Sequence, residues 1–597
     1  GIKAEASATT RTAIERYTFP AGRSNILVNF GEGLTNETGA WLRKISETEI
    51  EGMRLAGTFC YNPQAVFPVY FAIRINKVPS EGGFWKKQPL LSGVEAEWTP
   101  DDGTYKIYKK YGREIAGDDI GYWFTFETEE GEQVLLKCGI SFVSMEGAAK
   151  NLQSDIAGWD FDAVSRRAYD RWNQALSSIH VEGTERDKTL FYTSLYHTMI
   201  DPRCFSDADG AYQGADGKTH LAKDFVYRTI FSGWDVFRSQ FPLQTIINPR
   251  MVNDEINSLV QMAELSKREY FPRWEFLNSY SGCMLGNPAV SVIADAYQKG
   301  IRNYDVKKAV RYAQNTVNKF SNNEDGFTPG SLSMTLEYAY TDWCMSTLLR
   351  ATGDEEGADA FERKSKSYRS VWCDSVRWFR TRMADGTWMP WQGRNVHNQG
   401  CVESNNYQQG WFVPHDMEGL IGLMGEAYFE KELTAFFEGA DSSFMWGDFY
   451  NHPNEPDHHV PFMLNYTSKP WLTQYWTRRI CDKAYNETVN GLCGNEDVGQ
   501  MSAWYILASM GFHPICPGNN RYEITSPVFD KVTICLDKEY YPGKTFTIIA
   551  RNNSPENVYI QSLSLNGKPL DRLWITHEEI TNGGVLEFVM GKEPGLR

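Results

Sequence analysis

The spacing of apolar residues changes twice along this chain of 597 residues, and these two changes constrain the fold more than any other feature. Up to about residue 150, short runs such as NILVNF and QVLLKCGISFV alternate between apolar and polar positions, and Gly, Pro, Asn and Asp separate them. Such alternation is typical of antiparallel β-strands with one buried face. Between about 160 and 512, apolar residues recur at i, i+3 and i+4, as in amphipathic helices. After about 518 the alternation returns.

This pattern predicts a multidomain protein that combines β and α structure. We expect an antiparallel β-sandwich domain over residues 1–155, an (α/α)6 helical barrel over 156–515 as the catalytic domain, and a small β region over 516–597. The barrel is favoured because many amphipathic helices follow one another in pairs. The first residues, GIKAEASATT, lack the features of a signal peptide and resemble the middle of a strand, so we expect the first domain to be incomplete at its start.

Net charge and composition argue against several classes of partner. The chain carries 60 Lys and Arg against 76 Asp and Glu, a net charge of −16, so it lacks the basic surface that binds nucleic acid or anionic membranes. No run of about 18 apolar residues is present, so we expect no membrane-spanning segment. The eleven cysteines form no CxxC pair, which favours small buried side chains, with or without a few disulfides, over a metal–thiolate site.

Polar loops in the second half of the chain are the first candidates for chemistry. Five of the ten histidines lie between residues 397 and 459, among many carboxylate, amide and aromatic side chains. Loops on a rigid scaffold commonly carry functional sites. A solvated loop with a few hydrogen-bonded histidines is the alternative. The five are His397, His415, His452, His458 and His459.

Two carboxylates are candidates for acid–base chemistry. Glu403 stands between Val402 and several amides, with two aromatic residues shortly after, and partial desolvation would raise its pKa toward that of a general acid. Asp497 precedes a strongly amphipathic segment in GLCGNEDVGQMSAWY. Either residue could instead serve as the cap of a helix.

A Trp-Asp pair adds a further candidate. In FSGWDVFRSQFPL, Trp234 could stack on the apolar face of a sugar while Asp235 accepts hydrogen bonds from its hydroxyls; a core Trp beside a helix cap is the alternative. The chain contains no GxGxxG, P-loop, GxSxG or HExxH motif, so hydride transfer, phosphoryl transfer and serine hydrolysis lose support. Carboxylates set among aromatic residues are typical of glycoside hydrolysis.

Several long motifs, in order, closely resemble the glycoside hydrolase family 92 α-mannosidases, and the resemblance extends from residue 1 to beyond 590. It implies an N-terminal β-sandwich followed by an (α/α)6 barrel. It also implies calcium-dependent, exo-acting release of terminal mannose from mannose-containing glycans such as N-glycans, with inversion at the anomeric carbon, and an extracytoplasmic location. The motifs are FSGWDVFRSQFPL, SVIADAYQKGI, VESNNYQQGWFVPHDMEGLI, NHPNEPDHHVPFMLNY and GLCGNEDVGQMSAWYILASMGFHPICPG.

The resemblance assigns roles residue by residue. Glu403 matches the general acid and Asp497 the general base. Many members read GDED where this chain reads GNED, so Asn495 could position water but could not accept its proton. Members specific for α-1,2 linkages carry His-Glu where this chain has Asn-Glu, which indicates a preference other than strict α-1,2. Substrate binding is expected of Trp234 and Asp235 at the terminal mannose, of Asn454 and Glu455 at the next sugar, and of His459.

Calcium is the cofactor that the resemblance implies, although spacing selects no set of ligands among the many oxygen-bearing side chains. A hard cation can hold vicinal sugar hydroxyls and favour a distorted ring. The expected reaction is a single displacement in which water attacks from the face opposite the leaving group. Two alternatives stay open. One is a non-catalytic mannoside-binding protein on the same scaffold, and the other is an inverting phosphorylase, which would need inorganic phosphate and a basic pocket.

Overall fold

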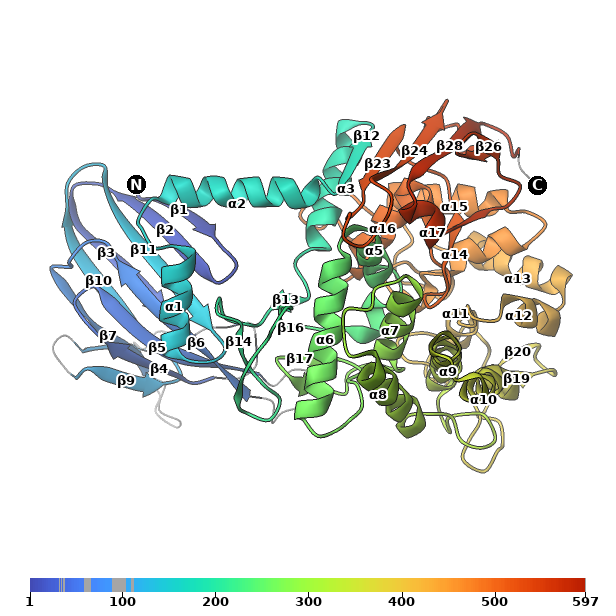
Figure 1. Cartoon of the computed structure of the whole chain (residues 1–597), viewed down its shortest axis with the longest axis horizontal. Coiled ribbons are helices and arrows are strands. Elements are labelled where there is room, and N and C mark those ends of the chain that lie inside the picture. The colour runs from blue at the N-terminus through green and yellow to red at the C-terminus, as the bar shows by residue number, and fades with distance from the viewer. Residues whose placement is uncertain are drawn as a thin grey trace, which may run out of the picture. The chain divides into compact units, whose positions relative to one another are not determined.

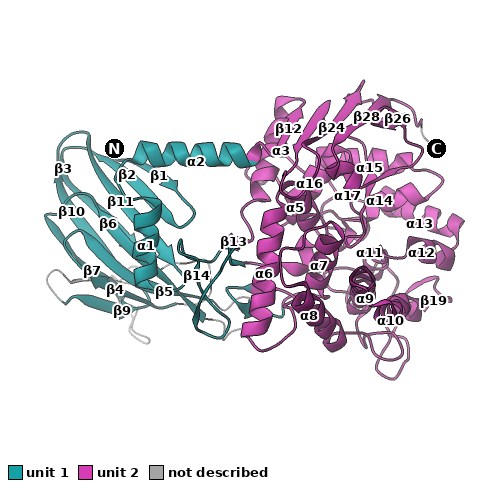
Figure 2. Cartoon of the chain, viewed as in Figure 1, with its two compact units in different colours: residues 1–175, 204–228, 276–282 teal, residues 176–203, 229–275, 283–597 magenta. Residues whose placement is uncertain are grey.

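The computed structural model describes residues 1–595 apart from 32, 34, 36–37, 58–65, 89–103 and 109–111. Contacts divide the chain into two compact units (Figure 2). The first comprises residues 1–175, 204–228 and 276–282, and the second comprises residues 176–203, 229–275 and 283–597. Because a compact unit and a domain need not share boundaries, the predicted domain limits at 155 and 515 stay predictions.

Two antiparallel sheets form most of the first unit (Figure 1). The larger has the order β1 (Lys3–Ala8), β2 (Thr12–Phe19), β11 (Glu132–Ser141), β6 (Val66–Ile75), β5 (Glu49–Gly57), β4 (Ala40–Lys44) and β9 (Glu114–Gly117). The smaller has the order β3 (Gly22–Asn29), β10 (Ile120–Thr128), β7 (Glu81–Gln88) and β8 (Thr104–Tyr108). Also in this unit are β14 (Ala211–Gln213), β15 (Thr219–Leu221), α1 (Met145–Asp155) and nearly all of α2 (Phe161–Leu176).

One apolar core joins these two sheets. Phe71 and Val134 from the larger sheet belong to the same buried cluster as Phe84 and Phe124 from the smaller. The alternation seen in the sequence thus places one face of each sheet on the other. The predicted N-terminal antiparallel β domain is confirmed.

Helices dominate the second unit up to about residue 510, as the helical periodicity predicts, and a short helix follows among the C-terminal strands. They are α3 (Glu185–His197), α4 (Gly233–Val236), α5 (Gln240–Ile247), α6 (Pro249–Leu265), α7 (Pro288–Gln298), α8 (Val306–Lys319), α9 (Leu332–Thr352), α10 (Glu355–Ser365), α11 (Asn406–Gln409), α12 (Met417–Met424), α13 (Glu426–Glu438), α14 (Val460–Met463), α15 (Trp471–Lys483), α16 (Gln500–Met510) and α17 (His577–Thr581). Three short 3-10 helices are η1 (Lys366–Val371), η2 (Glu455–Asp457) and η3 (Leu464–Tyr466). The closure of these helices into an (α/α)6 barrel stays a prediction.

The C-terminal strands return as predicted and lie in the same unit as the helices. A six-stranded sheet has the order β12 (Ile179–Glu182), β23 (Lys531–Cys535), β24 (Thr545–Arg551), β28 (Gly584–Gly591), β25 (Tyr559–Leu565) and β26 (Lys568–Pro569), with β24 and β28 parallel. A three-stranded sheet contains β21 (Phe512–His513), β22 (Arg521–Ile524) and β27 (Trp574–Thr576). The remaining short strands are β13 (Arg203–Cys204), β16 (Arg228–Thr229), β17 (Glu275–Phe276), β18 (Ser279–Tyr280), β19 (Trp372–Cys373) and β20 (Trp378–Phe379).

Cysteine chemistry contributes nothing to the covalent framework of the described residues. Ten of the eleven cysteines lie in that part of the chain, and none of these ten forms a disulfide. Five of them are buried, as expected for small apolar side chains. Among the described helices, none is both long enough and apolar enough to cross a bilayer.

A buried ion pair ties the helices to the C-terminal β region. Lys299 Nζ lies 2.7 Å from Asp295 Oδ2, and both side chains are at most 2% exposed. The other oxygen, Asp295 Oδ1, accepts a hydrogen bond from the backbone N–H of Gly518 at 2.9 Å. Burial alone would lower the pKa of Lys299, but the partners of the ammonium, chiefly Asp295, leave it raised. The ammonium therefore stays charged inside the protein.

Lys299→Met is expected to lower the free energy of unfolding by about 3–5 kcal/mol, because it leaves the Asp295 carboxylate buried without its cation. The double variant Asp295→Asn, Lys299→Met should regain much of this loss. Lys531→Met is the matched control, since its partner Glu182 and Lys531 itself are exposed and such a pair contributes at most about 1 kcal/mol. Denaturant midpoints measure all three, and equal midpoints for the two lysine variants would refute the role of the buried pair.

Candidate active site

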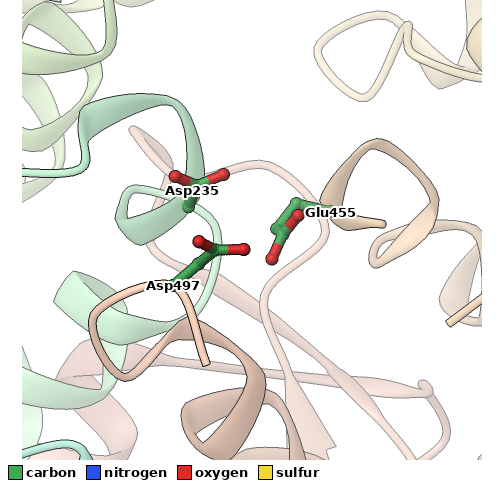
Figure 3. Close-up of side chains that lie close together, drawn as sticks. All are labelled: Asp235, Glu455 and Asp497. Atoms are coloured by element: carbon green, nitrogen blue, oxygen red, sulfur yellow. The ribbon is translucent and has the colours of Figure 1, made fainter. Parts of the chain in front are cut away.

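Three carboxylates from distant parts of the chain meet in the second unit (Figure 3). Asp235 comes from α4, Glu455 opens η2, and Asp497 lies in the loop that precedes α16. One oxygen from each lies within 4.8 Å of the others. Sequence patterns predicted all three as site residues, and the structure brings them together.

Burial and mutual repulsion dominate the electrostatics of this cluster. Asp235 is 3% exposed and Glu455 is 2% exposed. Loss of water, followed by the charge of Asp497, raises the pKa of Asp235 well above its usual range. Loss of water, followed by the charges of Asp235 and Asp497, does the same to Glu455. Three such groups cannot all ionise without a compensating proton or cation.

Asp497 keeps the most ionised character of the three. Desolvation raises its pKa, while a hydrogen bond from Glu455 lowers it. Within the described part of the chain, Glu455 Oε1 is buried and has no hydrogen-bond partner. The cluster thus contains a carboxylate suited to accept a proton beside a buried oxygen that is free for a ligand.

Asp497 is not a helix cap. The N-cap of α16 is Gly499, which has no side chain that could cap the helix. Asp497, Val498 and Gly499 have φ angles of +46°, +60° and +94°. Non-glycine residues rarely adopt this left-handed conformation, and a β-branched residue does so least readily. The capping alternative is therefore excluded for Asp497, and its backbone is held in an unfavourable conformation.

Glu403 is not a helix cap either. Asn405 caps α11 through a capping box, in which its side chain accepts from the backbone N–H of Gln408 while the Gln408 side chain accepts from the N–H of Asn405. Glu403 lies two residues before this cap with a φ of +54°. The Glu403 side chain therefore takes no part in capping α11.

Two hydrogen bonds hold the backbone around Glu403. Asn454 Nδ2 donates to the carbonyl oxygen of Glu403 at 2.9 Å. The backbone N–H of Val402 donates to Ser333 Oγ of α9 at 3.0 Å. Both candidate acid–base residues have left-handed backbone, which is common at functional sites, and other segments hold that of Glu403 in place.

Burial is the main cause that raises the pKa of Glu403, and the negative charge of Asp497 adds to it. The Glu403 side chain nevertheless reaches solvent. Its expected aromatic neighbours Trp411 and Phe412 are 0% and 2% exposed members of the hydrophobic core. A carboxyl that is open to ligand and easily protonated is suited to donate a proton.

Glu337 is a buried partner of Trp234 and Arg238 that sequence patterns did not reveal. It lies on α9 and accepts hydrogen bonds from Trp234 Nε1 at 3.1 Å and from the guanidinium of Arg238 at 3.0 Å. Arg238 also packs against the rings of Trp234 and Phe412, with its Cζ atom 5.2 and 4.9 Å from their centroids. A glutamate within an otherwise apolar helical run was the only signal that could have indicated a buried partner.

Trp234 is 1% exposed, and its indole N–H is already used by Glu337. A direct stack of this ring on a sugar stays a prediction. Asn454 is also buried and engaged with Glu403. Asn495 is exposed and is not part of the carboxylate cluster. Their contacts with substrate or water stay predictions too.

The histidine-rich loops supply mostly core residues. His459 is 7% exposed, and its Nε2 lies 2.9 Å from the carbonyl oxygen of Trp411. Burial lowers its pKa to about 4, so the ring is neutral near pH 7. His452 and His458 are also fully buried and hydrogen-bonded. The concentration of histidine in the sequence thus marks the packing behind the site, and a sugar contact by His459 stays a prediction.

This chain matches two protein-family models and several solved structures. The model of the glycosyl hydrolase family 92 N-terminal domain matches residues 1–141, and that of the family 92 catalytic domain matches residues 147–592. A family GH92 α-mannosidase from Bacteroides thetaiotaomicron is 29% identical with a TM-score of 0.90, and the match covers 100% of this chain and 79% of that one.

Two further relatives also match most of this chain. A family GH92 inverting mannosidase from the same organism is 28% identical with a TM-score of 0.86, over 100% of this chain and 82% of the other. An uncharacterized secreted glycosidase from Arthroderma benhamiae is 27% identical over an alignment of 548 residues, and the match covers 84% of this chain and 68% of that protein. Since the two family models together account for nearly the whole sequence, the chain belongs to glycoside hydrolase family 92.

Proposed function

We propose that this protein is an exo-acting, calcium-dependent α-mannosidase that releases terminal mannose from mannose-containing glycans with inversion at the anomeric carbon. The observation that supports it best is the pairing of a solvent-accessible carboxyl of raised pKa, Glu403, with the buried carboxylate cluster around Asp497. One solved relative is a family GH92 α-mannosidase, and another is an inverting mannosidase of the same family.

In the proposed reaction, Glu403 donates its proton to the glycosidic oxygen as the bond from that oxygen to C1 breaks. Asp497 accepts a proton from water, whose oxygen forms the new bond to C1 from the opposite face. The products are β-mannose and the shortened glycan with a free hydroxyl. Each turnover leaves Glu403 ionised and Asp497 protonated, so solvent must return the proton before the next one.

The carboxylate cluster fits a calcium ion. Ca²⁺ binds oxygen ligands at about 2.3–2.6 Å, so two ligands of one ion are at most about 5 Å apart. The three carboxylate oxygens satisfy this limit, because all lie within 4.8 Å of one another. We propose that Asp235 and Glu455 hold the ion and leave the less buried Asp497 to activate water. When bound, calcium would hold vicinal sugar hydroxyls and favour ring distortion toward an oxocarbenium geometry.

One assay separates this proposal from its two rivals. Purified protein is incubated with an aryl α-mannoside, with and without inorganic phosphate, and NMR identifies the first sugar formed. Phosphate-independent release of β-mannose is the expected result. A phosphate requirement would indicate the phosphorylase, and saturable binding without turnover would indicate a mannoside-binding protein. A panel of α-1,2, α-1,3, α-1,4 and α-1,6 mannobioses then defines the linkage, for which we propose a preference other than strict α-1,2.

The location that we propose is extracytoplasmic, since one curated relative is a secreted protein. Fractionation of the source cells, followed by immunodetection, tests it. Recovery in the cytoplasmic fraction alone would contradict the proposal.

Chelation is expected to abolish α-mannosidase activity, because the cluster would lose its compensating cation. Added Ca²⁺ should restore activity better than Mg²⁺, which demands a tighter octahedral shell. Initial rates after dialysis against chelator provide the measurement. Full activity in excess chelator would rule out calcium dependence.

Glu403→Gln is expected to reduce hydrolysis of mannobioses by about 10²–10⁴-fold, because their leaving oxygens need a proton. Aryl α-mannosides with good leaving groups should lose far less. The comparison uses kcat for both substrate types. An equal loss on both would show that Glu403 is not the general acid.

Asp497→Asn is expected to reduce hydrolysis of both substrate types alike, by about 10²–10⁴-fold, since water must be activated whatever the leaving group. Folding should survive, because Asp497 does not cap α16. Thermal unfolding serves as the control. α-Mannose as the first sugar that the wild-type protein forms, identified by NMR, would indicate two displacements and would make Asp497 a nucleophile instead of a base.

A further inference from the structure

The loop that carries Asp497 needs support from outside its own backbone. Its residues Asp497 and Val498 adopt left-handed φ angles of +46° and +60°, a conformation that is unfavourable for residues other than glycine. The first turn of α16 also gains no side-chain cap from Gly499. Something else must satisfy the free N–H groups of this turn and hold the loop in place.

Glu496, the residue before Asp497, provides that support. Its Oε1 accepts a hydrogen bond from the backbone N–H of Ser502 at 2.9 Å, and its Oε2 accepts one from Ser502 Oγ at 2.7 Å. Its own carbonyl oxygen accepts from the N–H of Met501 at 3.1 Å. The Glu496 side chain thus caps α16 and turns away from the carboxylate cluster.

His197 fixes Glu496 from a second helix. It is the last residue of α3, and its Nδ1 lies 2.7 Å from Glu496 Oε2. The Glu496 carboxylate raises the pKa of His197, in accord with a charged pair. The two side chains are 31% and 26% exposed, and pairs open to solvent contribute little to stability. The pair therefore adds little to stability, and its importance lies in its position directly before Asp497.

We propose that His197 is a positioning residue, which acts through Glu496 to hold Asp497 where it can accept a proton from water. This inference rests on the proposed inverting hydrolysis. His197 itself is assigned no contact with substrate. Loss of His197 should therefore impair the activation of water by Asp497 and should leave proton donation by Glu403 unchanged.

His197→Ala is expected to lower kcat by about 10- to 100-fold, since misplacing a catalytic group by about 1 Å has an effect of that size. The loss should be the same for an aryl α-mannoside and a mannobiose, with KM changed less than the rate. His197→Asn should recover most of the rate, because Asn Nδ2 can replace His Nδ1 as donor to Glu496. The matched control is His220→Ala, which removes a similarly exposed His–Asp pair in the first unit and should leave kcat unchanged.

Azide separates a positioning role from a merely structural one. Azide needs no deprotonation, so it should attack C1 of an aryl α-mannoside in His197→Ala, forming the C1–N bond as the C1–O bond to the aryl group breaks. The expected product is β-mannosyl azide, together with a recovered rate. A slow variant that azide does not rescue, or a variant with wild-type kcat, would overturn the proposal.

The structure of the variant gives a test that needs no activity. In a crystal structure of His197→Ala, Asp497 should leave the left-handed region or its carboxylate should move away from Asp235 and Glu455. An unchanged loop would overturn the positioning role. If the wild-type protein turned over no α-mannoside, the proposed function would fail, while this crystallographic comparison would still decide what holds the loop.

Discussion

Repulsion between buried carboxylates is the constraint on which the second unit depends. Asp235, Glu455 and Asp497 lie within a few ångströms of one another in a region from which water is largely excluded. Chains do not gather such charges without a partner for them, because removing ions from water is costly. Here a proton shared between Glu455 and Asp497, or a cation, must provide it. The second unit can be understood as a scaffold that holds these groups in place against that repulsion.

Two buried ion pairs of opposite charge belong to this scaffold. Arg238 and Glu337 compensate each other and fix the indole of Trp234. Asp295 and Lys299 do the same where the helices contact the C-terminal β region. Both pairs are buried, so each is costly to break but adds little net charge.

Local patterns in the sequence predicted the order of β, α and β structure because each element carries its own hydrophobic period. They also predicted Glu403, Asp497, Asp235 and Glu455 as site residues, the last of these through a family resemblance alone. Glu337 and His197 were not predicted, because contacts between segments that are distant in the sequence have no local signature. The contact of His197, for example, joins α3 to the loop before α16. The histidine-rich loops left two interpretations open for a related reason: histidine is a polar residue, yet His452, His458 and His459 are buried in the core.

The bond from Asn454 to the carbonyl oxygen of Glu403 has a consequence for protein engineering. Position 454 is where the family resemblance suggests that linkage preference is set, and it is also where the backbone of the proposed acid is anchored. A substitution that reshapes the sugar pocket there would release the left-handed turn at Glu403 as well. Altered specificity and impaired proton donation would then arise from a single change, so redesign of this pocket calls for a compensating donor to the Glu403 carbonyl.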